Sequence, residues 1–450
     1  MATQYDLELR VIACAECGAP LDVGPAGGTS TCRYCGREQS TKAAVREVPR
    51  AASAPAEPER IATLRAQDVH SIDPPRELSE LFVGIDLLPW KINDALALWN
   101  SLRRSLAREA DEFQSERLHR LTQALAAHFG AAQEPLRQRA LLETALDVLR
   151  TPRHQQAACA ALCRAACRAN DLRAAEGWLA LCDPRPLELE SDTELRFAQA
   201  YLALLQGNPQ RMLEVLGQSW SDVPIANVHE AECVALRSHA WEQLGRPDHA
   251  TELLDHFMQH TSSYGRFLCR RFVALHQHLG LCAQSGPAAD AAQRQRGLRL
   301  VEQKTGAPGL AWGITLGTVA LGLLVAAVLV LTGPGWGWGY YAAGMGGFMA
   351  SAFVVVARNS SRKARRARQL CSRGVSAAAR IVHASPTNQA TMGVPQLMYR
   401  VLVLPASGAP FEAHSIFHAD AALRARFAPG ALAVARFDPS DHRQVHLELD

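Results

Sequence analysis

The chain has 450 residues, with 47 Lys or Arg against 44 Asp or Glu, and its net charge at pH 7 is +3. This length favours two to four domains, and the even balance excludes a partner selected by overall charge. The first residues, MATQYDLELR, lack the apolar core of a signal peptide, so we expect the N-terminus to stay in the cytosol. The 12 cysteines form one quartet and scattered single residues, which favours reduced thiols over a secreted disulfide framework.

Residues 1–40 contain two C-x-x-C pairs, each followed by a glycine that permits a left-handed turn. The pattern resembles the zinc ribbon, a short N-terminal module of bacterial proteins, and the resemblance implies a Zn²⁺ site made by Cys14, Cys17, Cys32 and Cys35. Four sulfurs close the metal shell, so the predicted zinc is structural. A redox dithiol is the alternative, but it favours a single C-x-x-C at a helix start.

An Ala- and Pro-rich segment over residues 41–74 follows the ribbon. Its stretch VPRAASAPAEPER has the composition of a linker. We therefore expect the ribbon to be tethered to the next domain rather than packed against it.

Residues 75–285 predict an all-helical domain. Ala, Leu, Arg, Glu and Gln dominate, and apolar residues recur at three- and four-residue spacing in INDALALWNSL, LHRLTQALAAHF and LLETALDVL. Asn170, Gly207 and Gly245 lie 37 and 38 residues apart and are suited to turns between helices. The positions five and nine residues after each turn are expected on the inner face of the following helix: Ala175, Met212, Ala250, Leu179, Leu216 and Leu254.

The best copy of this repeat, AWEQLGRPDHATELL, resembles the turn and second helix of a tetratricopeptide repeat. It departs from that family in its period, which is 34 residues there, and in its poor first-helix pattern. We therefore predict a helical solenoid, and the resemblance implies protein partners.

Several motifs in the helical domain are weak signals. HEAEC (229–233) and HFMQH (256–260) approach zinc-protease spacing without forming H-E-x-x-H, and we interpret their histidines as surface or core residues. Cys159, Cys163 and Cys167 recur every fourth position. We favour an interface between packed helices over a metal site for these three cysteines.

An apolar block follows a juxtamembrane segment at 286–308. Residues 310–331, LAWGITLGTVALGLLVAAVLVL, span roughly 33 Å as a helix, enough to cross a bilayer core. A second stretch, 338–357, has small residues at every fourth position, as in closely packed membrane helices. We therefore expect a transmembrane hairpin over residues 309–358. The alternative is a buried hairpin inside a soluble protein.

A basic juxtamembrane segment over residues 359–373 follows the hairpin. The positive-inside bias then predicts a two-pass protein of the bacterial inner (plasma) membrane, with both termini in the cytoplasm. The run is expected to attract anionic lipid head groups, whereas nucleic acid is disfavoured because aromatic residues are not interleaved. The side chains predicted to face lipid head groups are Arg358, Arg362, Lys363, Arg365, Arg366 and Arg368.

Residues 374–450 alternate apolar and polar side chains. AARIVHA, QLMYRVLVLP, PFEAHSIF, ALAVARFD and QVHLELD predict five short strands, and HADAALRARF predicts a short helix. Five strands and a helix favour a small closed or nearly closed β-barrel, somewhat like an OB-fold. The end of the chain resembles a small β module of unknown function that follows membrane hairpins or repeats in bacterial proteins. His414 and His418 are expected to face solvent.

The sequence contains no enzyme signature and predicts neither a catalytic residue nor a cofactor other than zinc. It favours a membrane-anchored, cytosol-facing scaffold that binds protein through its helical repeats. A membrane-coupled sensor or regulator is the first alternative. The second is an enzyme whose site is assembled from distant residues, which a pocket gathering His and acidic side chains with shifted ionisation would favour.

Overall fold

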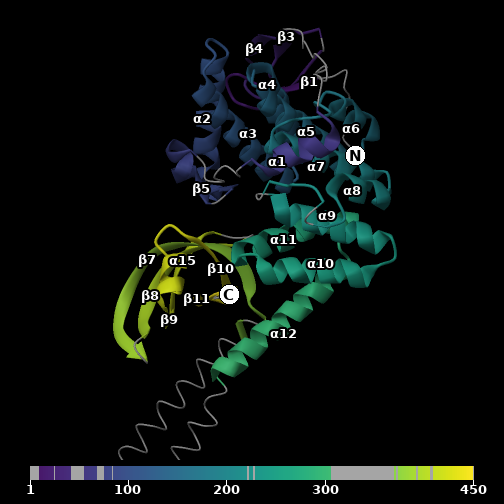
Figure 1. Ribbon diagram of the computed structural model, residues 1–450. Coiled ribbons are helices and arrows are strands. Elements are labelled where there is room, and N and C mark those ends of the chain that lie inside the picture. The colour runs from purple at the N-terminus through teal and green to yellow at the C-terminus, as the bar shows by residue number, and fades with distance from the viewer. Residues whose placement is uncertain are drawn as a thin grey trace, which may run out of the picture. The chain divides into compact units, whose positions relative to one another are not determined.

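The protein is described by a computed structural model. It covers residues 10–24, 26–41, 55–67, 75–83, 85–219, 222–226, 229–305, 369–370, 373–391, 394–405 and 409–448. The chain forms two compact units, and Figure 1 labels their elements. The first holds Met1–Phe257 and Leu268–Pro287, and the second holds Met258–Phe267 and Ala288–Asp450.

The structure does not support the expected membrane topology. Within the described ranges, no helix combines the length and the apolar character needed to cross a membrane. Helix α12 (Ser285–Thr305), which covers most of the predicted juxtamembrane segment, contains charged residues such as Asp290, Arg294 and Arg296, and charges are costly in a bilayer core. The prediction of a two-pass inner-membrane protein is therefore corrected. The predicted hairpin at 309–358 and the basic residues assigned to lipid head groups lie outside the described residues.

The first unit begins with two small β-hairpins. Strand β1 (Arg10–Ala13) pairs antiparallel with β2 (Pro20–Val23), and β3 (Gly28–Thr31) pairs antiparallel with β4 (Glu38–Thr41). Their buried core contains two cysteines of the quartet together with three aliphatic side chains: Cys14, Cys32, Ile12, Leu21 and Val23.

Helices form most of the rest of this unit, as the spacing of apolar residues predicts. In chain order they are α1 (Glu57–Arg65), α2 (Ile92–Leu106), α3 (Glu112–Ala131), α4 (Pro135–Val148), α5 (Pro152–Arg168), α6 (Leu172–Leu179), α7 (Leu189–Leu205), α8 (Pro209–Leu216), α9 (Glu230–Gln243), α10 (Pro247–His260) and α11 (Ser263–Leu275), the last two crossing into the second unit. Between α1 and α2, the 3₁₀ turns η1 (Arg76–Leu81) and η2 (Pro89–Lys91) flank a hairpin of β5 (Phe82–Val83) and β6 (Asp86–Leu87), which the sequence did not predict.

The ribbon is packed against the helices, contrary to the expectation of a tethered module. The amide of Ala13 donates to Thr144 Oγ1 on α4 at 2.8 Å. The guanidinium of Arg103 on α2 donates to the Ala13 carbonyl at 2.9 Å. Arg10, which is buried, forms an ion pair with Asp147 on α4. The side chains that hold the ribbon are therefore supplied by distant helices, and the composition of the intervening segment carries no sign of them.

Part of the segment expected to be a linker is also structured. Helix α1 lies within it and packs on the start of α7. Arg60 of α1 forms an ion pair with the buried Asp192 at 2.5 Å and donates to the Pro186 carbonyl at 3.0 Å. Leu64 packs with Leu189 in one buried cluster.

The turns between helices repeat as the sequence indicates. Asn170, Gly207 and Gly245 have φ values of +59°, +65° and +76°. In each turn the next residue donates its amide to the carbonyl five positions earlier, which caps the preceding helix. These bonds join Asp171 to Ala166, Asn208 to Ala203 and Arg246 to Trp241 at 2.8–3.0 Å.

A further copy of the turn lies 37 residues before Asn170, at Gln133. Gln133 has φ +59°, and the following Glu134 donates to the Phe129 carbonyl at 2.8 Å, as in the other three turns. Glutamine is not a turn signal, so the sequence pattern did not reveal this copy.

The four turns define four helical hairpins that stack along the chain. The turns join α3 to α4, α5 to α6, α7 to α8 and α9 to α10. The helices of the first three pairs pack against each other, and α5 packs against both α3 and α7. Of the six positions predicted on the inner face, five are buried and Leu179 is only half-buried, because its neighbour Trp178 takes the buried position. Cys159, Cys163 and Cys167 are buried on α5, and the Cys163 thiol points to the Ala198 carbonyl of α7.

The second unit contains a five-stranded antiparallel sheet in the order β11-β10-β7-β8-β9. The strands are β7 (Val375–Thr391), β8 (Val394–Leu404), β9 (Phe411–His418), β10 (Leu432–Asp438) and β11 (Asp441–Leu447), and α15 (Ala421–Arg426) lies between β9 and β10. All five strands and the helix were predicted. Tyr399, Val401 and Phe427 are among the side chains of its core. His414 is exposed, as expected.

The sequence predicts a closed or nearly closed barrel, and the closed form is wrong. Strand β7 shifts register against β8 between Ile381 and His383 and again between Pro386 and Ala390, and such bulges bend a sheet. The bend brings the edge strands β9 and β11 near each other. In the part of the chain that the structure describes, however, no hydrogen-bonded ladder joins these two strands, and a closed barrel requires one.

Candidate functional site

The first unit contains a pocket on the inner side of its helical stack. Its volume is about 370 Å³, within the range of roughly 300–1,000 Å³ that is usual for small-molecule sites. The lining comes mainly from the first helix of successive hairpins, α3, α5, α7 and α9. Helix α11, the β5–β6 hairpin and Gln138 of α4 complete it. The repeat therefore creates the pocket, because it aligns one face of each of these helices.

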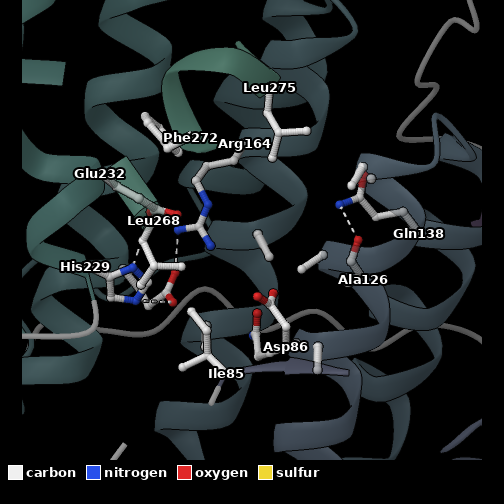
Figure 2. Close-up of a pocket in the computed structure, with 18 of the residues that line it drawn as sticks. Ile85, Asp86, Ala126, Gln138, Arg164, His229, Glu232, Leu268, Phe272 and Leu275 are labelled. Atoms are coloured by element: carbon white, nitrogen blue, oxygen red, sulfur yellow. Dashed lines mark hydrogen bonds and ion pairs between the residues drawn. The ribbon is translucent and has the colours of Figure 1, made fainter. Parts of the chain in front are cut away.

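One wall of the pocket is a chain of alternating charges. Arg164 of α5 forms an ion pair with Glu194 of α7. His229 Nε2 lies 3.4 Å from Glu194 Oε1, and His229 Nδ1 lies 3.3 Å from Glu232 Oε2. Figure 2 shows Arg164 beside His229 and Glu232, with Gln138 on the opposite side of the pocket. Burial alone would lower the pKa of His229, but the two carboxylates raise it to about 10, so this imidazole is cationic at neutral pH.

A second wall centres on Glu116 of α3. Its carboxylate accepts from His154 Nε2 at 2.9 Å, from Arg120 Nε at 2.9 Å and from Arg153 Nη2 at 3.0 Å. The hydrogen bond from His154 is the main reason that the pKa of Glu116 falls to about 2. The ring of His119 stacks on that of His154, with their centroids 4.4 Å apart.

The third wall is formed by α7, by α11 and by His276, which directly follows α11. The Tyr201 hydroxyl lies 2.9 Å from His276 Nε2, and His276 Nδ1 lies 2.9 Å from the Phe272 carbonyl. Since Nδ1 donates to this carbonyl, Nε2 accepts from the tyrosine. Burial lowers the pKa of His276, which keeps this imidazole neutral. Arg271, also on α11, pairs with Asp86 of β6.

The pocket histidines differ in what they offer to a ligand. His229 and His276 have both ring nitrogens engaged by the protein. His154 uses Nε2 for Glu116, and its Nδ1 is buried without a partner. His278 is exposed. His119 has no hydrogen-bond partner among the described residues, and burial lowers its pKa to about 3, so it is a neutral imidazole at the pocket wall.

The sequence motifs did not predict this pocket. HEAEC was set aside because it lacks H-E-x-x-H, yet its His229 and Glu232 belong to the charged wall. The partner Glu194 lies two helices earlier, and no local pattern relates it to His229. The histidines of HFMQH, His256 and His260, are exposed and do not line the pocket.

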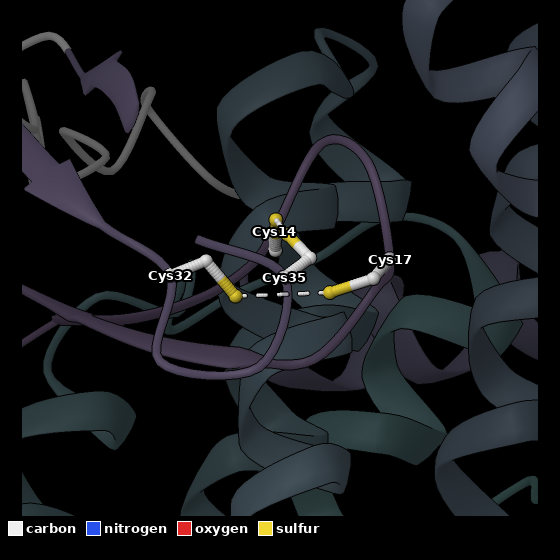
Figure 3. A group of neighbouring side chains, drawn as sticks. All are labelled: Cys14, Cys17, Cys32 and Cys35. Atoms are coloured by element: carbon white, nitrogen blue, oxygen red, sulfur yellow. Dashed lines mark hydrogen bonds between the residues drawn. The ribbon is translucent and has the colours of Figure 1, made fainter. Parts of the chain in front are cut away.

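The cysteine quartet forms a second, separate site in the first unit. The thiols of Cys14, Cys17, Cys32 and Cys35 lie within 4.8 Å of one another and could hold a metal ion. The Sγ atoms of Cys14 and Cys35 are 3.7 Å apart, as are those of Cys17 and Cys32. Figure 3 shows the four sulfurs converging from two loops. Among the described residues, no other group of His, Cys, Asp and Glu has metal-ligand spacing.

The two loops that carry these thiols have the same backbone. Gly18 and Gly36 have φ values of +71° and +70°, as predicted for the glycine after each pair. Their amides donate to the carbonyls of Cys14 and Cys32 at 3.0 and 2.9 Å. Hydrogen bonds from backbone amides, first that of Cys35, lower the pKa of the Cys32 thiol to about 6, which favours the thiolate that binds metal.

Comparison of the chain with protein-family models, with curated proteins and with solved structures finds no match. The resemblances to a zinc ribbon, to tetratricopeptide repeats and to a small β module therefore remain predictions from the sequence.

Proposed function

We propose that the chain is a binding protein that holds a ligand, or a segment of a protein partner, in the pocket of its helical domain. The observation that carries this proposal is that the carboxylates of the pocket are neutralised by cations of the protein itself. Each lining carboxylate already has a cationic partner within the protein. Preorganised walls of this kind suit binding, because little reorganisation is needed when a ligand arrives.

The arrangement of the histidines favours binding over catalysis. A general base must offer a ring nitrogen to the substrate. Of the pocket histidines, His229 and His276 have none to offer, and the second nitrogen of His154 is buried. A stack of helical hairpins also presents a concave inner face, the surface through which helical-repeat proteins bind their partners.

We also propose that the cysteine quartet holds a structural Zn²⁺. With Zn–S bonds of roughly 2.3 Å, the edges of a tetrahedron of sulfurs measure about 3.8 Å. The two distances of 3.7 Å agree with that geometry. Four thiolates complete the zinc shell, so the ion would stabilise the ribbon and leave no position for a substrate.

A pocket-filling substitution tests the binding proposal. Ala127 is exposed at the pocket lining on α3, and Ala127→Trp would occupy its space. Ala62→Trp is the matched control, because Ala62 is exposed on α1 away from the pocket. After crosslinking in cell extract, mass spectrometry should find ligands or partners that contact the unsubstituted chain and Ala62→Trp but not Ala127→Trp. Identical crosslinked species for all three chains would refute a binding role for the pocket.

An enzyme is the second candidate, and it rests on His119. This neutral imidazole is the buried pocket histidine with a nitrogen left for a substrate. In this test, metabolites from a cell extract are incubated with the chain and analysed by mass spectrometry. An enzyme should convert at least one metabolite, and His119→Asn should abolish this conversion whereas Ala62→Trp should retain it. If no metabolite changes with the intact chain, the enzyme candidate is rejected.

A further inference from the structure

Arg168 differs from every other cation of the pocket. It is the last residue of α5 and lines the pocket in a half-buried position. Its guanidinium donates to Gln138 Oε1 at 3.4 Å and interacts with the Tyr201 hydroxyl, and both of these partners are neutral. Among the residues that the structure describes, no carboxylate lies within ion-pair distance of Arg168.

The other charges of the pocket compensate one another. Each cation has at least one carboxylate partner: Arg120 and Arg153 with Glu116, Arg164 and His229 with Glu194, and Arg271 with Asp86. Glu190 and Glu232 are also paired, with Arg120 and His229. The charge left over in the pocket is therefore the single positive charge of Arg168.

We infer that Arg168 anchors an oxyanion, a carboxylate or a phosphate, carried by the ligand of this pocket. The inference rests on the proposed binding function and specifies the chemistry that the site recognises. A guanidinium has five N–H donors in a planar fork, which matches two oxygens of either anion. Arg168 places at most two of these donors on protein groups.

The rest of the lining indicates an apolar body next to the anionic group. Alanines of α3 and α5 contribute to the pocket, and α11 adds Leu268, Phe272 and Leu275. The ligand class is thus an organic anion with an apolar portion, either a small molecule or a side group of a partner protein.

A competing role for Arg168 is purely structural. A cation in the last turn of α5 interacts favourably with the negative end of the helix dipole. A lysine would fill that role almost as well, whereas it cannot form the two parallel hydrogen bonds of a guanidinium. Arg168→Lys therefore separates the two roles, and Arg168→Gln removes both.

The test uses the full chain and three aromatic probes of similar size. Benzoate and phenyl phosphate carry the two anions, and benzamide is the neutral counterpart of benzoate. Isothermal titration calorimetry measures binding, and the rate at which phenylglyoxal modifies Arg168, followed by mass spectrometry, reports occupancy at this side chain. Arg173→Gln is the matched control, because Arg173 is exposed on α6 outside the pocket. Circular dichroism checks that each variant is folded.

At least one of the two anions should bind roughly tenfold or more tightly than benzamide and should slow the modification of Arg168. Arg168→Gln should weaken that binding by a similar factor, and Arg168→Lys, which keeps the structural charge, should also weaken it. Arg173→Gln should leave the binding unchanged. Tighter binding of benzoate assigns a carboxylate, and tighter binding of phenyl phosphate assigns a phosphate.

Two results overturn the inference. If benzamide binds as tightly as the anions and Arg168→Gln changes nothing, the pocket binds ligands without an anion anchor, and the proposed binding function stands. If none of the probes binds, the anion anchor is also rejected, and the crosslinking comparison of Ala127→Trp with Ala62→Trp then decides on the binding function separately.

Discussion

The cysteine ribbon and the helical pocket concentrate ionisable groups in opposite ways. In the ribbon, four thiols lie within 4.8 Å of one another, a spacing that could hold a metal ion. In the pocket, carboxylates and cations pair with each other, and among the residues that the structure describes no carboxylate pairs with the guanidinium of Arg168. This difference in charge indicates which kind of ion each site is suited to bind. We propose that the ribbon holds a metal cation and that the pocket accepts one anion.

Loss of the metal is expected to have the largest effect of any change to the first unit. Structural zinc contributes on the order of 10 to 16 kcal/mol in small modules. Cys14→Ser should abolish stoichiometric zinc, measured by elemental analysis. Because Ala13 and Arg10 bind α4 directly, hydrogen exchange should increase in α4 as well as in the ribbon. Cys163→Ala is the control, because it changes a buried cysteine outside the quartet, and it should retain the zinc. If α4 keeps its protection from hydrogen exchange in Cys14→Ser, the ribbon and the helices are independent.

Breaking the charged wall of the pocket should have the next largest effect. Glu194→Gln removes the carboxylate that both Arg164 and His229 contact. Removal of one partner from a buried ion pair costs about 3–5 kcal/mol, since it leaves an uncompensated charge. Urea denaturation should show this loss. Glu214→Gln is the control, because Glu214 pairs with Arg211 on the exposed surface, where a pair contributes about 0–1 kcal/mol. Equal losses for the two variants would contradict the pairing described for the pocket.

The same two regions show what a sequence can and cannot predict. The four cysteines of the ribbon lie close together in the chain, and their spacing, with Gly18 and Gly36, identifies both the turns and the clustered thiols. Strand alternation likewise predicted the five strands of the second unit, although not the open sheet that they form. The pocket depends on pairs such as Arg164 with Glu194, which are brought together only when hairpins stack. No local pattern encodes such a pair.

The packing of the ribbon was missed for a related reason. Composition identified the segment after the ribbon as a linker, but the contacts that fix the ribbon come from Arg103 and Thr144 on helices further along the chain. Barrel closure also depends on whether the edges of β9 and β11 meet in register, and alternation within single strands does not specify that.

The ionisation of His229 provides a second test of the charged wall. Its pKa is raised to about 10 in the folded chain, above the ordinary value of 6.5. A raised pKa means that the folded state holds the proton more tightly, so this stabilisation is complete below pH 6.5 and is lost as the pH rises towards 10. The free energy of unfolding should fall by on the order of 1–3 kcal/mol between pH 6.5 and 10. His229→Gln should flatten that slope, measured by urea denaturation at several pH values. An unchanged slope would mean that other groups cause it.

The smallest expected effect concerns the turns between helices. These turns are formed within a few residues, and they position a pocket whose residues are far apart in the sequence. Gly207 and Gln133 occupy equivalent turns with φ values of +65° and +59°, a region that costs a residue with a side chain roughly 1 kcal/mol. Gly207→Ala should therefore lower the free energy of unfolding by about 1 kcal/mol, whereas Gln133→Gly should leave it unchanged or raise it slightly, because relief of strain offsets the greater freedom of glycine in the unfolded chain. Parallel urea denaturation of the two variants measures both changes. The difference between the two variants is the diagnostic result. Loss of stability in both would mean that Gln133 contributes through its side chain and that the fourth turn is not equivalent to the others.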